Sequence, residues 1–160
     1  MRPASKVCLL LTVLYALMIF YLSSLSDPKV PGVGLKLVEH LIRSMQHSDY
    51  LVVFAPFYPL LKKPDKVLHI LLYFGFGILL FLTLKGTGKT QGMALVLAFF
   101  LGVLYGASDE FHQMFVAGRT ASAMDLTADA AGVLLAQALA LAVYMLTTVY
   151  SYIYARFRSV

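Results

Sequence analysis

The chain has 160 residues, of which 60% are hydrophobic and 13% are charged, and its mean hydropathy is +0.80. A soluble domain is about half apolar and a quarter charged, so this composition indicates an integral membrane protein with a single domain, residues 1–160. The net charge of +5 does not indicate nucleic-acid binding, because the cations are spread over loops and ends, and the single cysteine excludes a disulfide framework.

Four apolar stretches reach or approach the length of about 20 residues that a membrane-spanning helix needs. They are residues 7–25, 67–84, 92–116 and 121–150. The predicted fold class is therefore an all-α integral membrane protein with four transmembrane helices. The first stretch follows Arg2 and Lys6, as a signal peptide would, but its apolar core is longer than is usual for one.

The first connection, residues 26–64, is too long to be a turn and contains two apolar segments. Residues 33–47 have one apolar helical face and one polar face, which predicts an amphipathic helix lying in the membrane interface. Residues 50–61 are too short and too interrupted by proline to cross the membrane, which favours a re-entrant or interfacial segment. Two interpretations stay open: a connector along the membrane surface, or a lid over the polar residues described below.

The distribution of charge predicts the orientation of the four spans. One side receives only cations: Arg2, Lys6, Lys85, Lys89, Arg156 and Arg158. By the positive-inside rule this side is cytoplasmic, together with both termini, and the long first loop is extracytoplasmic. All eight carboxylates fall on the opposite side or in the outer turns of the spans. Three lysines at 62, 63 and 66 also fall there, but long loops translocate largely regardless of charge.

Small residues recur every four positions in the third and fourth spans. They are Gly102 and Gly106 in the third, and Ala128, Gly132, Ala136 and Ala140 in the fourth. Such stripes predict close approach between helices, so we assign these positions to packing.

Polar residues recur at helical spacing in the last three spans, which places them on one face within each helix. The groups are Asp65, Lys66, His69 and Tyr73; Asp109, Glu110 and Gln113; and Asp125 and Asp129. A carboxylate at the centre of a bilayer costs about 2.5–3.5 kcal/mol. These groups are therefore expected to face one another and Arg119, in an extracytoplasmic polar cavity between spans two, three and four.

The same residues stand in three motifs that resemble those of the VanZ-like family. The motifs are Asp65-Lys66-x-x-His69-x-x-x-Tyr73-Phe74, then Tyr105-Gly106-x-x-Asp109-Glu110-x-x-Gln113-x-Phe115, then Gly118-Arg119-x-x-x-x-x-Asp125-x-x-x-Asp129-x-x-Gly132. The resemblance covers residues 65–135 and implies a small bacterial membrane protein linked to teicoplanin resistance, with no defined reaction. Many members carry Asn where this chain has Asp129, so the resemblance does not require a charge there.

Two functions of different classes follow, and whether the protein is an enzyme stays open. We favour recognition of a membrane lipid or lipid-linked envelope molecule without turnover. The binding residues would be Asp65, Lys66, Tyr73, Gln113, Arg119, Asp125 and Asp129. The alternative is a hydrolase or transferase acting on a lipid-linked or phosphate-bearing headgroup, with His69 as base and Asp109 or Glu110 as the orienting carboxylate. No cofactor is expected. The alternative is a divalent cation, although no compact motif such as H-E-x-x-H is present; the plausible ligands are His69, Asp109, Glu110, His112, Asp125 and Asp129.

Overall fold

The computed structural model describes residues 3–26, 40, 43, 60 and 63–158, and this part of the chain forms four long helices. They are α1 (Pro3–Ser23), α5 (Pro64–Gly86), α6 (Gln91–Gln113) and α7 (Ala123–Arg158). Each is long and apolar enough to cross a membrane, which confirms the predicted all-α fold class with four spans. The chain is therefore a multi-pass membrane protein.

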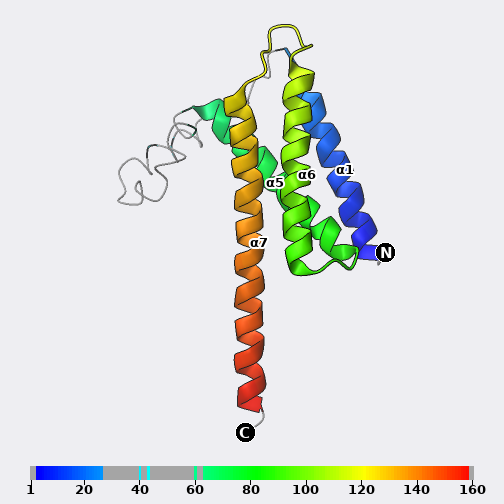
Figure 1. Ribbon diagram of the computed structural model, residues 1–160, viewed down its shortest axis with the longest axis vertical. Coiled ribbons are helices and arrows are strands. Elements are labelled where there is room, and N and C mark those ends of the chain that lie inside the picture. The colour runs from blue at the N-terminus through cyan, green and yellow to red at the C-terminus, as the bar shows by residue number, and fades with distance from the viewer. Residues whose placement is uncertain (1–2, 27–39, 41–42, 44–59, 61–62, 159–160) are drawn as a thin grey trace.

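The helices run alternately up and down and pack side by side (Figure 1). α5 crosses the bundle obliquely, contacts each of the other three helices and packs most extensively against α7. The N-terminus, the C-terminus and the turn between α5 and α6 all point toward one end of the molecule. The opposite end is formed by the start of α5, the end of α6 and the start of α7, so residues from these three segments are brought together.

The helix bounds depart from the predicted ones in ways that local chemistry explains. α5 begins at Pro64, because proline fits the first turn of a helix, where its missing N–H is not needed. α6 ends at Gln113, three residues before the predicted end, and a turn containing Gly118 at φ 79° leads into α7. The two predicted segments of the first loop, 33–47 and 50–61, lie outside the described residues except for single positions within them.

The predicted packing role of the small residues is confirmed. Ala128, Gly132 and Ala136 are buried on α7, and Gly102 and Gly106 are buried on α6. A Cβ added at Gly132 would clash with the backbone carbonyl of Ile70 and lie 3.0 Å from the backbone nitrogen of Phe74, both in α5. Glycine at this position therefore sets the close approach of α5 and α7.

α7 is much longer than its neighbours and extends past their ends (Figure 1). Its 36 residues correspond to about 54 Å of helix, whereas the hydrocarbon core of a bilayer is about 30 Å thick. Residues 141–158 are all exposed, although many of them are apolar. The packed part of α7 is thus its first half, which carries the two aspartates.

Candidate functional site: a polar cluster at one end of the bundle

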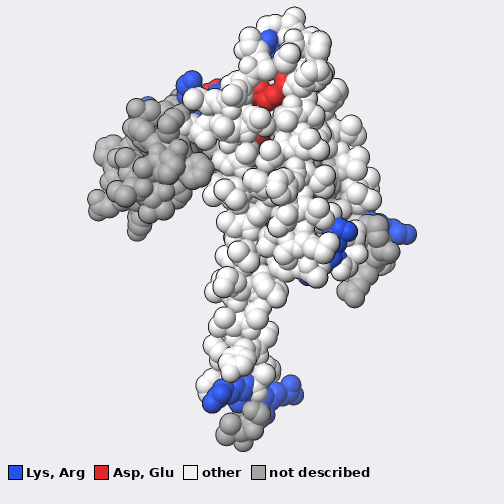
Figure 2. Space-filling view, in the orientation of Figure 1, with Lys and Arg blue, Asp and Glu red and all other residues white. Residues whose placement is uncertain are grey.

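Five acidic residues lie at the end of the bundle where α5 begins, α6 ends and α7 begins. They are Asp65, Asp109, Glu110, Asp125 and Asp129. In the space-filling view of Figure 2, the visible acidic surface is confined to this end, while the far ends of the helices show only Lys and Arg. All of these acids except Asp65 are buried, so they face the inside of the bundle.

Lys66 joins the start of α5 to the start of α7. Its ammonium lies 2.7 Å from Asp65 Oδ2 and forms a second ion pair with Asp125 Oδ1. The side chains of Lys66 and Asp125 are 11% and 9% exposed, whereas that of Asp65 is 61% exposed. The pair with Asp125 is therefore shielded from water and gives this buried carboxylate its countercharge.

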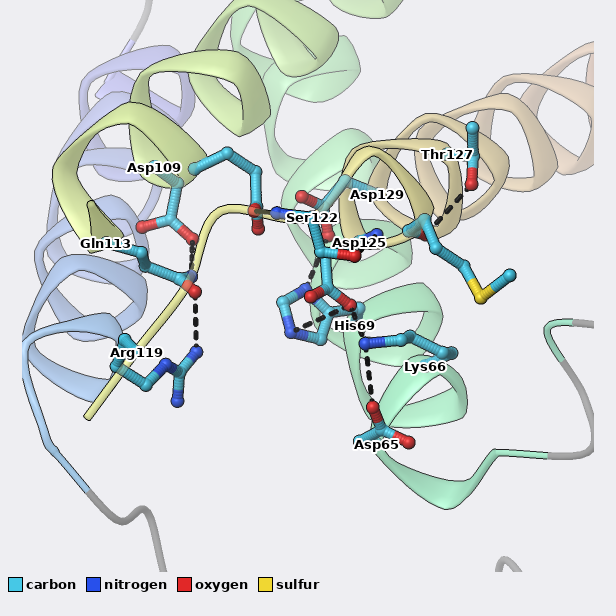
Figure 3. Close-up of polar contacts among 12 residues, drawn as sticks. Asp65, Lys66, His69, Asp109, Gln113, Arg119, Ser122, Asp125, Thr127 and Asp129 are labelled. Carbon is cyan, nitrogen blue, oxygen red and sulfur yellow. Dashed lines mark hydrogen bonds and ion pairs between the residues drawn. The ribbon is translucent and has the colours of Figure 1, made fainter.

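His69 lies one turn further along α5 and faces α7. Its Nδ1 lies 2.9 Å from Asp129 Oδ1, a hydrogen bond in which the carboxylate accepts, and its Nε2 lies 3.8 Å from Asp125 Oδ1. Asp129 is fully buried. Figure 3 shows the imidazole between the two aspartates of α7 and close to the Lys66 ammonium.

A second chain of contacts runs from the turn between α6 and α7 into α6 (Figure 3). Arg119 Nη2 donates to Gln113 Oε1 over 2.8 Å, and Gln113 Nε2 donates to Asp109 Oδ2 over 3.2 Å. Arg119, which was expected to face the acids, therefore reaches Asp109 through the amide of Gln113. Glu110 Oε2 accepts a 2.7 Å hydrogen bond from the backbone N–H of Ser122, which joins the end of α6 to the start of α7.

Three buried oxygen atoms of the cluster have no partner within the described part of the chain: Tyr73 Oη, Glu110 Oε1 and Asp129 Oδ2. Asp125 Oδ1 has the Lys66 ammonium as its partner, and the Asp109 carboxylate lies beside the Ser23 side chain. Buried polar atoms are nearly always hydrogen bonded, so each such atom calls for a reason. Gly106 helps to make the arrangement possible, because a Cβ there would lie 3.1 Å from Asp129 Oδ2 and 3.3 Å from Tyr73 Cε1.

All ten predicted site residues lie in or beside this cluster. The hydrolase or transferase alternative paired His69 with Asp109 or Glu110, and its hydrogen-bond partner is Asp129. Ser122 was not predicted, although it begins a Ser-x-x-Asp pattern that is typical of a helix start, and its Oγ accepts from the N–H of Asp125. His112 contacts α1, where its Nε2 lies 3.0 Å from Ser24 Oγ.

Comparison with known proteins adds one finding. The family model described as VanZ/LLP1 matches residues 7–146, which includes α1 as well as the three helices of the cluster. No curated protein and no solved structure matches the chain.

Proposed function

The chain belongs to the VanZ/LLP1 family, and from this membership and the buried polar cluster we propose a non-catalytic role at the bacterial cell envelope. The protein sits in the cytoplasmic membrane and uses the cluster to recognise a polar group of a lipid or lipid-linked envelope molecule at the outer face. The expected phenotype is protection against teicoplanin or a related glycopeptide.

The observation that carries this proposal is the set of buried oxygen atoms without a partner. Three helices contribute them: Tyr73 from α5, Glu110 from α6, and Asp129 from α7. Leaving a buried polar atom unsatisfied costs about 1–3 kcal/mol, so a structural lock alone would favour apolar residues or complete pairing. Spare acceptor atoms are what a site for a donor-bearing or cationic group requires.

The rim of the cluster offers a contact for an anionic group. Arg119 is half-buried and uses Nη2 for its bond to Gln113, and a guanidinium carries further N–H donors that match phosphate or carboxylate oxygens. Envelope lipids and lipid-linked precursors carry phosphate beside hydroxyl or amino groups. A cluster with a cationic rim and acidic interior suits such a mixed headgroup.

The charge pattern supports the outer face. Within the described residues, the end of the bundle opposite the cluster carries Lys6, Lys85, Lys89, Arg156 and Arg158 and no acid. By the positive-inside rule that end faces the cytoplasm, which leaves the cluster on the outer side.

The contacts do not favour the hydrolase or transferase alternative. That alternative needs His69 as a base oriented by Asp109 or Glu110, and these two acids bond instead to Gln113 and to the backbone of Ser122. His69 is held by Asp129.

The test is teicoplanin susceptibility of a sensitive Gram-positive host that expresses the wild type, Glu110→Gln or Ser108→Ala at matched membrane levels. Glu110→Gln keeps the size of the side chain and removes its charge. Ser108 is exposed on the same helix, and its hydroxyl bonds to the backbone carbonyl of Tyr105. We expect the wild type and Ser108→Ala to raise the minimum inhibitory concentration, and Glu110→Gln to return it to that of the empty vector.

Two results would contradict the proposal. Equal protection by wild type and Glu110→Gln would remove Glu110 from the recognition site. An unchanged inhibitory concentration with the wild type would remove glycopeptide protection as the role of this chain.

A further inference from the structure

We infer that His69, Glu110 and Asp129 form a binding site for one divalent cation, with zinc as the ion that fits their chemistry best. Each residue offers one ligand atom, and the three atoms lie within 4.8 Å of one another. They come from α5, α6 and α7, so the ion would join the three helices at the centre of the cluster. Two zinc bonds of about 2.1 Å at a tetrahedral angle place their donor atoms about 3.4 Å apart. The three atoms now lie within 4.8 Å of one another, so small side-chain movements would bring them to the spacing that zinc requires.

The charge balance of the cluster calls for a cation. Lys66 is taken by Asp65 and Asp125, and Arg119 bonds to the neutral amide of Gln113. Within the described residues, neither Glu110 nor Asp129 forms an ion pair with a lysine or an arginine, and the ionisable partner of Asp129 is His69, which is neutral when its imidazole ligates a metal. A buried carboxylate without a countercharge is costly, and one dication would compensate both.

Two of the candidate ligand residues also have a free oxygen atom. Asp129 is fully buried and uses Oδ1 for His69, which leaves Oδ2 without a partner, and Glu110 likewise uses Oε2 and leaves Oε1. The Tyr73 side chain is 1% exposed and its hydroxyl has no partner, and its ring and the Asp129 carboxylate both lie against Gly106. A hydroxyl that donates to a ligating carboxylate is the usual outer-shell support of a metal site.

The ligand set selects the kind of ion. One imidazole nitrogen and two carboxylate oxygens suit zinc and neighbouring first-row ions. Calcium takes six to eight oxygen ligands, and magnesium prefers an octahedron of oxygens with several waters. An ion with three protein ligands keeps an open position, which would take an anionic group of the envelope molecule; this last step, unlike the metal site itself, rests on the proposed function.

The experiment measures the zinc content of the full chain, purified in detergent through a tag without histidine. Each protein is treated with a chelator, incubated with zinc chloride, desalted and analysed by mass spectrometry. We expect about one zinc per chain for the wild type, as for a single structural or catalytic site. His69→Gln and Asp129→Asn should lose most of this zinc. Ser108→Ala, a change at an exposed residue of α6 outside the cluster, should retain it.

Thermal unfolding of the wild type gives a second measurement that does not depend on the folding of the variants. An ion that binds only the folded state stabilises it, so added zinc should raise the melting temperature of the chelator-treated wild type and of Ser108→Ala. A zinc content near zero, an equal content in wild type and Asp129→Asn, or an unchanged melting temperature would each overturn the inference. Equal stabilisation by magnesium or calcium would overturn the choice of ion. These measurements use purified protein, so their failure is distinct from a failure in the susceptibility test.

Discussion

Lys66 is the residue on which the charge balance of the cluster depends. Replacing it by methionine keeps most of the aliphatic volume and leaves Asp125, which is buried, without its cation. Removing one partner of a buried ion pair costs about 3–5 kcal/mol. We expect Lys66→Met to lower the melting temperature in detergent strongly, while Lys63→Met, a change at a nearby exposed lysine, leaves it unchanged.

Combining Lys66→Met with Asp125→Asn separates loss of the ion pair from other effects of the substitutions. Asp125→Asn removes the carboxylate that Lys66→Met leaves unpaired, so the double variant should be more stable than Lys66→Met alone. If the loss of stability in the double variant equals the sum of the losses in the two single variants, the Lys66–Asp125 pair is not what stabilises this end of the bundle.

Arg119 should matter less for stability than Lys66. Its hydrogen bond is to Gln113, a neutral amide that also bonds to Asp109, so Arg119→Ala leaves an unsatisfied amide oxygen and no uncompensated charge in direct contact. The expected loss is about 1–3 kcal/mol, measured as a smaller fall in melting temperature than for Lys66→Met. A fall as large as that of Lys66→Met would mean that Arg119 acts on the acids directly.

At the residue scale, helical spacing identified the members of the cluster but not their partners. The i, i+4 rule places His69 and Tyr73 on one face of α5, and Asp125 and Asp129 on one face of α7. Whether His69 then meets Asp129 or Glu110 depends on how far each helix is rotated about its axis. That rotation is set by contacts such as Gly132 against α5, which spacing within one helix does not report.

At the element scale, the two glycines Gly132 and Gly92 should respond oppositely to the same substitution. A Cβ at Gly132 meets the backbone of α5, which cannot move aside as a flexible side chain would, whereas a Cβ at Gly92 has open space within 4 Å. We expect Gly132→Ala to push α5 and α7 apart and to cost about 1–3 kcal/mol. Gly92→Ala should leave the stability unchanged or slightly higher, because alanine favours the helix.

Thermal unfolding of the two variants measures this difference in stability. The zinc content of Gly132→Ala tests whether the cluster is disturbed as well. His69 lies one residue before Ile70, whose carbonyl the new methyl group would meet, and Asp129 lies one turn before Gly132. Separation of α5 from α7 should therefore weaken the cluster as well as the fold. Equal melting temperatures for the two variants would show that α5 and α7 can part at this point without loss.

The helices themselves were largely predictable, because length and hydropathy are enough to identify spans. Their ends were less predictable: α7 continues to Arg158, eight residues beyond the predicted end at residue 150. The residues from 141 onward are exposed and continue the helix with residues such as Leu146 that form helices well. Apolar composition therefore indicated the span, and it gave no signal for the point at which packing stops and the helix continues alone.

At the scale of the whole molecule, two groups of cations lie on the side opposite the acidic cluster. Lys85 and Lys89 lie at the turn between α5 and α6, and Arg156 and Arg158 lie at the end of α7. These two groups lie at different levels of the molecule, because α7 extends past the ends of the other helices (Figure 1). Translocating either group would oppose the positive-inside rule, so the α5–α6 turn and the end of α7 independently favour one orientation.

Cysteine labelling of whole cells tests this orientation. In a Cys8→Ala background, Ala117→Cys and Thr87→Cys place one thiol at exposed positions in the α6–α7 and α5–α6 turns, respectively. Because the acidic end is expected to face outward, a membrane-impermeant thiol reagent should label Ala117→Cys in intact cells and Thr87→Cys only after permeabilisation. The reverse pattern would place the cluster at the cytoplasmic face. An extracytoplasmic glycopeptide or lipid-linked precursor would then be out of its reach, and the envelope role would fail while the metal site, which depends only on the contacts of three helices, would stand.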